Sequence, residues 1–127
     1  MQPEHRSGSR AQSFKHAFAG WWHVIRTQQN AWIHAFATLV VVALGWYLQL
    51  DWGQWADIVL AIGLVWLAEF LNTALEAVVD LASPTQHPLA KVGKDVGAAG
   101  VLIAAVVAAL VGFTVLGPPL LERLFGS

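Results

Sequence analysis

The sequence contains no cysteine and few charged residues. Asp, Glu, Lys and Arg together make up 12% of the 127 residues, and no Cys is present. A soluble globular domain carries roughly 25% charged residues. Disulfide bonds and thiolate metal sites are therefore excluded, and the low charge favours a protein that lies in a membrane.

Hydrophobic residues make up 57% of the chain and gather in long runs. Residues 27–50 and 96–121 contain no Asp, Glu, Lys or Arg, and a third apolar run covers residues 58–68. About 20 helical residues cross a hydrocarbon layer of ~30 Å. We therefore predict an all-α membrane protein with transmembrane helices at about residues 31–50, 57–80 and 96–121, and little sequence remains for a separate soluble domain.

The N-terminal region divides into two parts. Residues 1–13 are polar, so we expect them to be disordered, and they lack the apolar core of a cleaved signal peptide. In residues 14–27 large apolar side chains such as Phe14, Phe18 and Trp21 recur at helical spacing opposite the basic ones. This pattern predicts an amphipathic helix on the membrane surface. A soluble amphipathic helix is the alternative, but the chain offers no soluble core to receive it.

The distribution of basic residues predicts the orientation of the spans. Arg6, Arg10, Lys15 and Arg26 precede the first span, and two lysines lie between the second and third. Basic residues accumulate on the cytoplasmic side of a membrane. We therefore expect a multi-pass protein of the cell (inner) membrane, with its N-terminus and residues 81–95 in the cytoplasm.

Polar residues form a stripe on the second predicted span. Glu69, Asn72, Glu76 and Asp80 stand at offsets of three, seven and eleven from the first, so they share one face of a helix. A carboxylate near the middle of a bilayer costs roughly 2.5–3.5 kcal/mol on insertion scales. Because such residues are expensive in lipid, the stripe predicts a functional site.

The segment between the second and third spans, SPTQHPLAKVGKD, carries the basic partners of this stripe. Lys91 and Lys94 are one turn apart and can face one anion, although lysines beside a membrane also attract anionic lipid. Together with Glu76 and Asp80 they predict a site for a metal-bound phosphate. His87 could also approach a phosphate.

Other nucleotide and metal signatures are missing from the sequence. There is no G-x-x-x-x-G-K-[ST] loop, no G-x-G-x-x-G turn and no H-E-x-x-H pair. His34, inside the first span, is interpreted as a buried, hydrogen-bonded residue rather than a metal ligand. Small residues recur on the third span and predict close helix packing and oligomerisation; they are Gly93, Gly97, Gly100, Ala104, Ala108 and Gly112.

The run AEFLNTALEAVVDLASPTQHPLAKVGKDVGAAGVLIAA, residues 68–105, closely resembles the small prokaryotic diacylglycerol kinase and undecaprenol kinase family. The family pattern is E-x-x-N-[ST]-A-[IL]-E-x-x-x-D followed by K-D at a fixed distance, and both parts are present. The resemblance implies that residues 14–127 form one membrane kinase domain. It also implies a homotrimer that transfers the γ-phosphoryl group of ATP, with Mg²⁺, to a membrane alcohol.

The same resemblance implies roles for individual residues. Glu69 corresponds to the general base, with Asn72 beside it in the catalytic geometry. Nucleotide contacts are implied for Glu76, Lys94 and Asp95, to which His87 is added, and Asp80 and Lys91 would support them. Glu76 would also bind the metal.

One position departs from the family pattern. Many relatives have glutamate in E-x-N-x-x-I-H before the first span, as a second metal ligand, whereas this chain reads QQNAWIH with Gln28 there. An amide oxygen can still coordinate Mg²⁺, but without the charge of a carboxylate the binding should be weaker.

The substrate has two candidates. The proline pair and the A-K-x-x-K-D ending of the loop resemble the undecaprenol branch more than the diacylglycerol branch, so undecaprenol is favoured and diacylglycerol is the alternative. Buried glutamates also occur in proton-coupled transporters, and a purely structural role is a further alternative. A proton-coupled transporter does not need Lys94, Asp95 and Asn72. No nucleic-acid partner is expected.

Overall fold

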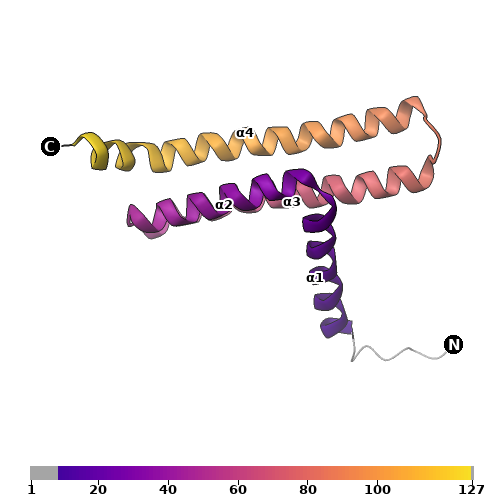
Figure 1. Cartoon of the computed structure of the whole chain (residues 1–127), viewed down its shortest axis with the longest axis horizontal. Coiled ribbons are helices and arrows are strands. Elements are labelled where there is room, and N and C mark those ends of the chain that lie inside the picture. Colours follow the sequence, from indigo (N-terminus) through magenta and orange to yellow (C-terminus); the bar gives the residue numbers. More distant parts are fainter. Residues whose placement is uncertain (1–8, 127) are drawn as a thin grey trace.

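The computed structural model describes residues 9–126, which form helices joined by short connections. The helices are α1 (Ser9–Thr27), α2 (Gln29–Tyr47), α3 (Trp52–Ala82) and α4 (Pro88–Phe125). In Figure 1, α2, α3 and α4 run alongside one another, whereas α1 projects away from them. Each of the three long helices is long and apolar enough to cross a membrane. The predicted all-α fold with three such helices is confirmed.

The helix boundaries differ from the predicted ones. α1 begins at Ser9, so the prediction of disorder is wrong for residues 9–13, while residues 1–8 lie outside the described part. α3 and α4 contain 31 and 38 residues and extend beyond the predicted spans at both ends. At 1.5 Å per residue these helices measure about 46 and 57 Å, against ~30 Å of hydrocarbon. Hydropathy locates the lipid-compatible part of a helix, but not where the helix ends.

Local capping sets two of these ends. At the start of α3, the Asp51 carboxylate accepts a hydrogen bond from the Gln54 backbone N–H at 2.8 Å, and the Gln54 side-chain oxygen accepts one from the Asp51 N–H at 3.0 Å. This reciprocal pair is a capping box. At the start of α4, His87 Nδ1 accepts a hydrogen bond from the Leu89 N–H at 3.1 Å, and Pro88 occupies the first turn. Proline is tolerated there because the first N–H groups have no helical partner.

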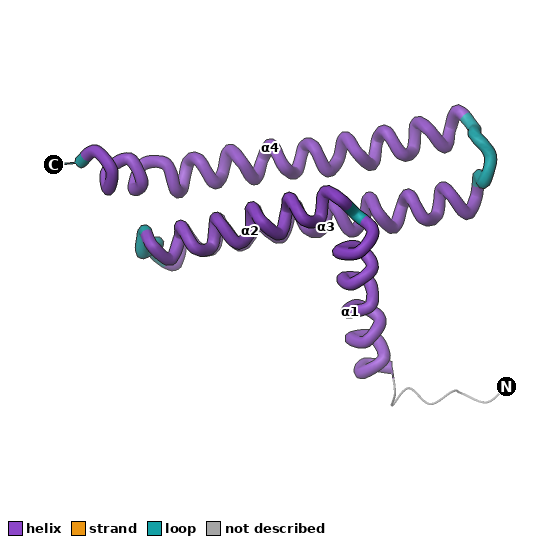
Figure 2. Tube along the Cα trace, viewed as in Figure 1, coloured by secondary structure: helices purple, strands orange, loops and turns teal. Residues whose placement is uncertain are grey.

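The turn between α2 and α3 is held by tight packing at one end of the molecule. A Cβ atom placed on Gly45 would lie 2.7 Å from the ring of Trp55, so only glycine fits against that ring. Leu48, Leu50 and Ile58 form a buried apolar cluster there with Val115 of α4. Figure 2 shows this turn and the α3–α4 loop at opposite ends of the bundle. The bundle therefore has a buried apolar cluster at one end and the α3–α4 loop at the other.

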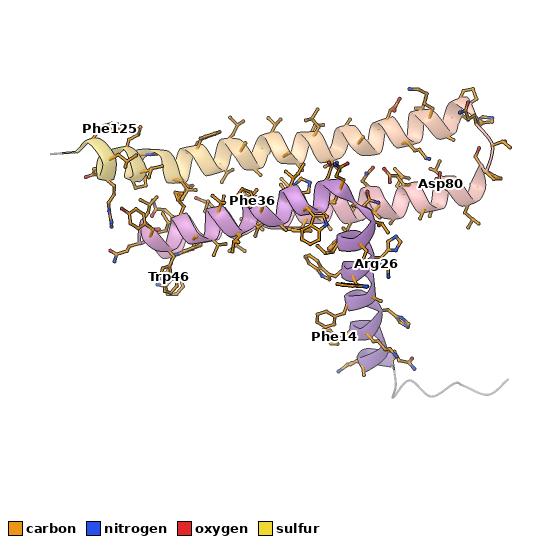
Figure 3. All side chains as sticks on the ribbon, in the orientation of Figure 1. Phe14, Arg26, Phe36, Trp46, Asp80 and Phe125 are labelled. Carbon is orange, nitrogen blue, oxygen red and sulfur yellow. The ribbon has the colours of Figure 1, made fainter. Side chains whose placement is uncertain are left out.

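α1 meets the bundle part-way along α3. The ring of Trp21 lies 5.0 Å from that of Trp66 and 4.5 Å, edge to face, from that of Phe70. Further toward its N-terminus, α1 leaves Phe14 and Phe18 largely exposed (Figure 3). Apolar side chains on a helix that projects from a membrane bundle are typical of a helix in the membrane surface.

The outer faces of the long helices also expose large apolar residues. Phe36 on α2 is 70% exposed, and Phe113 on α4 is 77% exposed. Contiguous exposed apolar surface of this extent indicates contact with lipid or with other protein chains. The single chain is thus consistent with the predicted oligomer, whose trimeric state stays a prediction.

Candidate active site

The predicted polar stripe lies on α3 and passes from buried to exposed along the helix. Glu69 is 1% exposed and Asn72 is 9% exposed, whereas Glu76 is half-buried and Asp80 is exposed. The Asn72 Nδ2 donates a hydrogen bond to Glu76 Oε1 at 3.1 Å. Because an amide fixes one oxygen of Glu76, the orientation of this carboxylate depends on Asn72.

The stripe begins at the level where α1 meets α3. α1 joins α3 at Trp66 and Phe70, on either side of Glu69. The predicted position of α1 in the membrane surface would place Glu69 near the interface and the part of α3 after Phe70 outside the hydrocarbon. Figure 3 shows Asp80 on this part of α3, near the α3–α4 loop, and Trp46 at the opposite end of the bundle. Glu69 itself is shielded by protein, whereas Asp80 is exposed.

Glu69 faces an imidazole of α2. His34 Nε2 lies 3.3 Å from Glu69 Oε2, and the two side chains are 12% and 2% exposed. Neither atom has a hydrogen-bond partner of acceptable geometry. The His34 side chain is thus largely shielded, close to the prediction, but the prediction that it is hydrogen-bonded is wrong for Nε2.

The lysines at the start of α4 pair with carboxylates from both helices. Lys94 Nζ lies 2.5 Å from Asp80 Oδ1 and joins α4 to α3. Lys91 Nζ donates to Asp95 Oδ2 at 2.6 Å one turn along the same helix, and both side chains are largely exposed. Exposed ion pairs of this kind contribute little to stability. Both lysines can therefore exchange their partners for a phosphate without unfolding the helix ends.

An open depression of about 770 Å³ lies beside the α3–α4 loop. Three of the four residues expected to contact nucleotide, His87, Lys94 and Asp95, line it together with the supporting residue Lys91, whereas Glu76 does not. His87 Nδ1 accepts the capping hydrogen bond from Leu89, so in the neutral ring Nε2 carries the hydrogen. That N–H remains available to a phosphate oxygen.

A second hollow, an apolar groove of about 500 Å³, lies between α2, α3 and α4. Its walls include Val41 and Leu44 of α2 and Leu120 of α4. The polar side chains in its lining belong to His34 and Thr38, and His34 is the one that contacts Glu69. The groove therefore begins beside the buried carboxylate and continues as hydrocarbon-like surface.

Comparison with known proteins identifies the family. The family model of prokaryotic diacylglycerol kinase matches residues 15–116. The chain belongs to the prokaryotic diacylglycerol kinase family. The undecaprenol kinase of Bacillus subtilis (strain 168) is 40% identical over 108 residues, which are 85% of this chain and 88% of that protein.

Two diacylglycerol kinases are also similar to the chain. That of Synechocystis sp. is 44% identical over 111 residues, which are 87% of this chain and 63% of that protein. That of Helicobacter pylori is 33% identical over 101 residues, covering 74% of this chain and 79% of that protein. The chain is therefore a membrane lipid kinase, and the resemblance drawn from residues 68–105 is confirmed.

The prediction of a bound Mg²⁺ requires a site with oxygen ligands. Within residues 9–126, no group of three or more His, Asp and Glu side chains stands close enough to hold a metal alone. Mg²⁺ needs no such group, because it usually binds one or two carboxylates together with substrate phosphates. Glu76 supplies carboxylate oxygen, held by Asn72 within reach of water, so the donor chemistry of the site fits Mg²⁺.

The position of Gln28 neither supports nor excludes its expected metal role. It is the N-cap residue of α2, and its side chain makes no capping hydrogen bond. Its amide oxygen is therefore not committed to the helix end. The second metal ligand at this position stays a prediction.

The sequence pointed to all four residues of the stripe and to His87, Lys91, Lys94 and Asp95 beside the loop, but not to the surroundings of Glu69. Trp66 Nε1 donates to Thr38 Oγ1 at 3.0 Å, and the His34 and Trp66 rings meet edge to face at 6.2 Å. These residues come from two helices, and no spacing in the sequence connects positions on different helices. The sequence indicated only that a polar residue, His34, lies within an apolar span, and it did not indicate which residue His34 contacts.

Proposed function

We propose that the chain is an undecaprenol kinase, which transfers the γ-phosphoryl group of ATP to undecaprenol at the cytoplasmic face of the cell membrane. The observation that carries the choice of substrate is the similarity to the undecaprenol kinase, which extends over 88% of that protein. The more identical Synechocystis diacylglycerol kinase is matched over only 63% of its length.

The apolar groove supports the same choice. Diacylglycerol carries ester groups beside its hydroxyl, and a polar group buried without a hydrogen bond loses free energy. The groove lining offers only His34 and Thr38 as polar side chains, and the Thr38 hydroxyl is already bonded to the His34 backbone oxygen and to Trp66. A hydrocarbon chain with one terminal hydroxyl suits such a lining better than a diester.

The proposed reaction starts at Glu69. Its carboxylate accepts the proton of the lipid hydroxyl while the hydroxyl oxygen forms a bond to the γ-phosphorus and the bond from that phosphorus to the β–γ bridging oxygen breaks. ADP leaves with the bridging oxygen. A buried carboxylate next to the membrane interface is suited to this role, because the alcohol arrives from lipid and the nucleotide from water.

The other residues hold the nucleotide in place. Lys94 and Lys91 compensate the phosphate charge, and His87 Nε2–H donates to a phosphate oxygen, with Asp95 at the rim of the same depression. Bound Mg²⁺ would neutralise triphosphate charge, and Glu76, oriented by Asn72, is the residue that would hold it. Asp80 keeps Lys94 directed across the gap between α3 and α4.

The assembly and orientation form part of this proposal. The N-terminus lies in the cytoplasm, as the basic residues indicate, so the depression beside the loop faces the ATP pool. A homotrimer is supported by the apolar outer faces of α2 and α4, which a single chain leaves uncovered. The relatives named above are kinases, so the transporter interpretation gains no support from them.

Purified protein in lipid, supplied with γ-labelled ATP and either undecaprenol or diacylglycerol, tests the proposal. We expect labelled undecaprenyl phosphate, its loss in Glu69→Gln, and normal activity in the control Glu122→Gln, an exposed residue at the other end of α4. A higher kcat/KM for diacylglycerol would reverse the substrate assignment. Absence of labelled lipid with either alcohol would refute the function.

A further inference from the structure

Three buried polar atoms at the stripe lack hydrogen-bond partners. They are His34 Nε2, Glu69 Oε2 and Asn72 Oδ1, and they are all of the buried side-chain polar atoms without a partner within residues 9–126. The large majority of buried side-chain polar atoms in folded proteins are paired. Glu69 and Asn72 are each more than nine-tenths buried, so these atoms are shielded from bulk solvent. Such a concentration of unpaired atoms indicates a place where a ligand completes the hydrogen bonds.

The imidazole of His34 is held in place without using Nε2. Its ring meets the edge of Trp66, and the Trp66 N–H is fixed by Thr38, whose hydroxyl donates to the His34 backbone oxygen at 2.7 Å. Nε2 then stands 3.3 Å from Glu69 Oε2 but out of line for a hydrogen bond. The two atoms are therefore close neighbours, but they do not form a hydrogen bond with each other.

The same imidazole is the polar end of the apolar groove. From His34 to Leu44, the α2 wall of the groove extends over ten residues, or about 15 Å. The Thr38 hydroxyl already donates one hydrogen bond and accepts another, whereas His34 Nε2, in the same lining, has no hydrogen-bond partner. A molecule that fills the groove can therefore make a polar contact at one end, beside Glu69.

We propose that His34 is a substrate-binding residue that holds the acceptor hydroxyl against Glu69. The His34 Nε2–H donates to the hydroxyl oxygen, the hydroxyl donates to Glu69 Oε2, and the hydrocarbon chain of the alcohol occupies the groove. A hydroxyl can donate once and accept at the same time, so one group satisfies both unpaired atoms. The assignment rests on the proposed lipid kinase function and adds to it the residue that orients the acceptor.

Replacement of His34 should impair the use of the lipid alcohol without impairing the binding of ATP. In His34→Leu we expect the kcat/KM for the lipid alcohol to fall at least about tenfold while the KM for ATP stays within about twofold. His34→Gln keeps an N–H donor and should recover part of the loss. Phe36→Leu, on the exposed face of α2, is the matched control and should resemble the wild type.

A measurement on the wild-type protein covers the case in which His34→Leu fails to fold. The methyl ether of the alcohol can accept from His34 but cannot donate to Glu69, and the corresponding hydrocarbon can do neither. We expect the ether to inhibit about fivefold more strongly than the hydrocarbon, and this advantage to be absent in folded His34→Leu. Equal inhibition of the wild type by both compounds would overturn the assignment.

The outcomes keep the two proposals apart. If the wild type labels no alcohol, the lipid kinase function itself fails. If the wild type is active and Glu69→Gln is inactive, but His34→Leu keeps the wild-type KM and kcat for lipid, only the role of His34 fails. An equal rise of the KM for ATP and for lipid in His34→Leu would also overturn it, because it would show a general distortion of the site.

Discussion

Gly97 on α4 lies directly against the side chain of Asn72 on α3. A Cβ atom at position 97 would overlap Asn72 Oδ1 and would come within 3.0 Å of Leu75 Cδ2. Asn72 in turn holds Glu76 by its hydrogen bond. The absence of a side chain on one helix thus sets the position of a carboxylate on the other.

Gly97→Ala should therefore reduce activity without removing any functional group. The added methyl group displaces the Asn72 amide and with it Glu76, and small displacements in an active site cost roughly 10- to 100-fold in rate. We expect a loss of kcat in this range, with a higher Mg²⁺ requirement. Gly100→Ala is the control, because nothing lies within 4 Å of a Cβ there. Equal activity of the two variants would show that Asn72 is free to move.

Gln28→Glu tests the position that departs from the family pattern. A carboxylate binds a hard cation more strongly than an amide oxygen does, so the Mg²⁺ concentration for half-maximal activity should fall. Titration of activity with MgCl₂ at saturating ATP measures this. Gln29→Glu, the exposed neighbour, adds the same charge as a control. An unchanged or raised requirement in Gln28→Glu would count against a metal role for the residue.

Lys94 and Asp80 form one ion pair, but their removal should have unequal effects. Lys94→Met removes a phosphate contact, and charge-assisted hydrogen bonds of this type correspond to roughly 10- to 100-fold in kcat/KM for ATP. Asp80→Asn leaves the lysine free to bind phosphate and should cost less than tenfold. Steady-state kinetics with varied ATP distinguish the two. If Asp80→Asn lowered kcat/KM for ATP as much as Lys94→Met does, Asp80 would have a direct role in the reaction.

The orientation in the membrane can be read from single cysteines, because the natural chain has none. Thr85→Cys lies in the exposed α3–α4 loop, and Gly53→Cys lies in the turn region at the opposite end. We expect a membrane-impermeable maleimide to label position 85 only when the cytoplasmic side is accessible, and position 53 from the outside. Labelling of position 85 from the outside would place the nucleotide residues away from ATP and would remove the basis of the proposed function.

The sequence by itself determined the features that repeat along one helix. The three apolar runs, the amphipathic N-terminal helix and the face shared by Glu69, Asn72 and Glu76 follow from periodicity, and this information is local. Even there, the start of α1 at Ser9 was missed, because polar helical residues leave no apolar pattern. The family pattern in residues 68–105 added the activity.

The tertiary structure decided which helix faces meet and at what level. His34 opposes Glu69 across 35 positions of sequence, Lys94 reaches Asp80 across the hairpin, and Trp21 sets α1 at the level of Phe70. No spacing rule connects residues on different helices, because the relative rotation and shift of two helices depend on how all their side chains pack. The stripe could be seen in the sequence, whereas the imidazole beside it and the level at which α1 meets α3 depended on that packing.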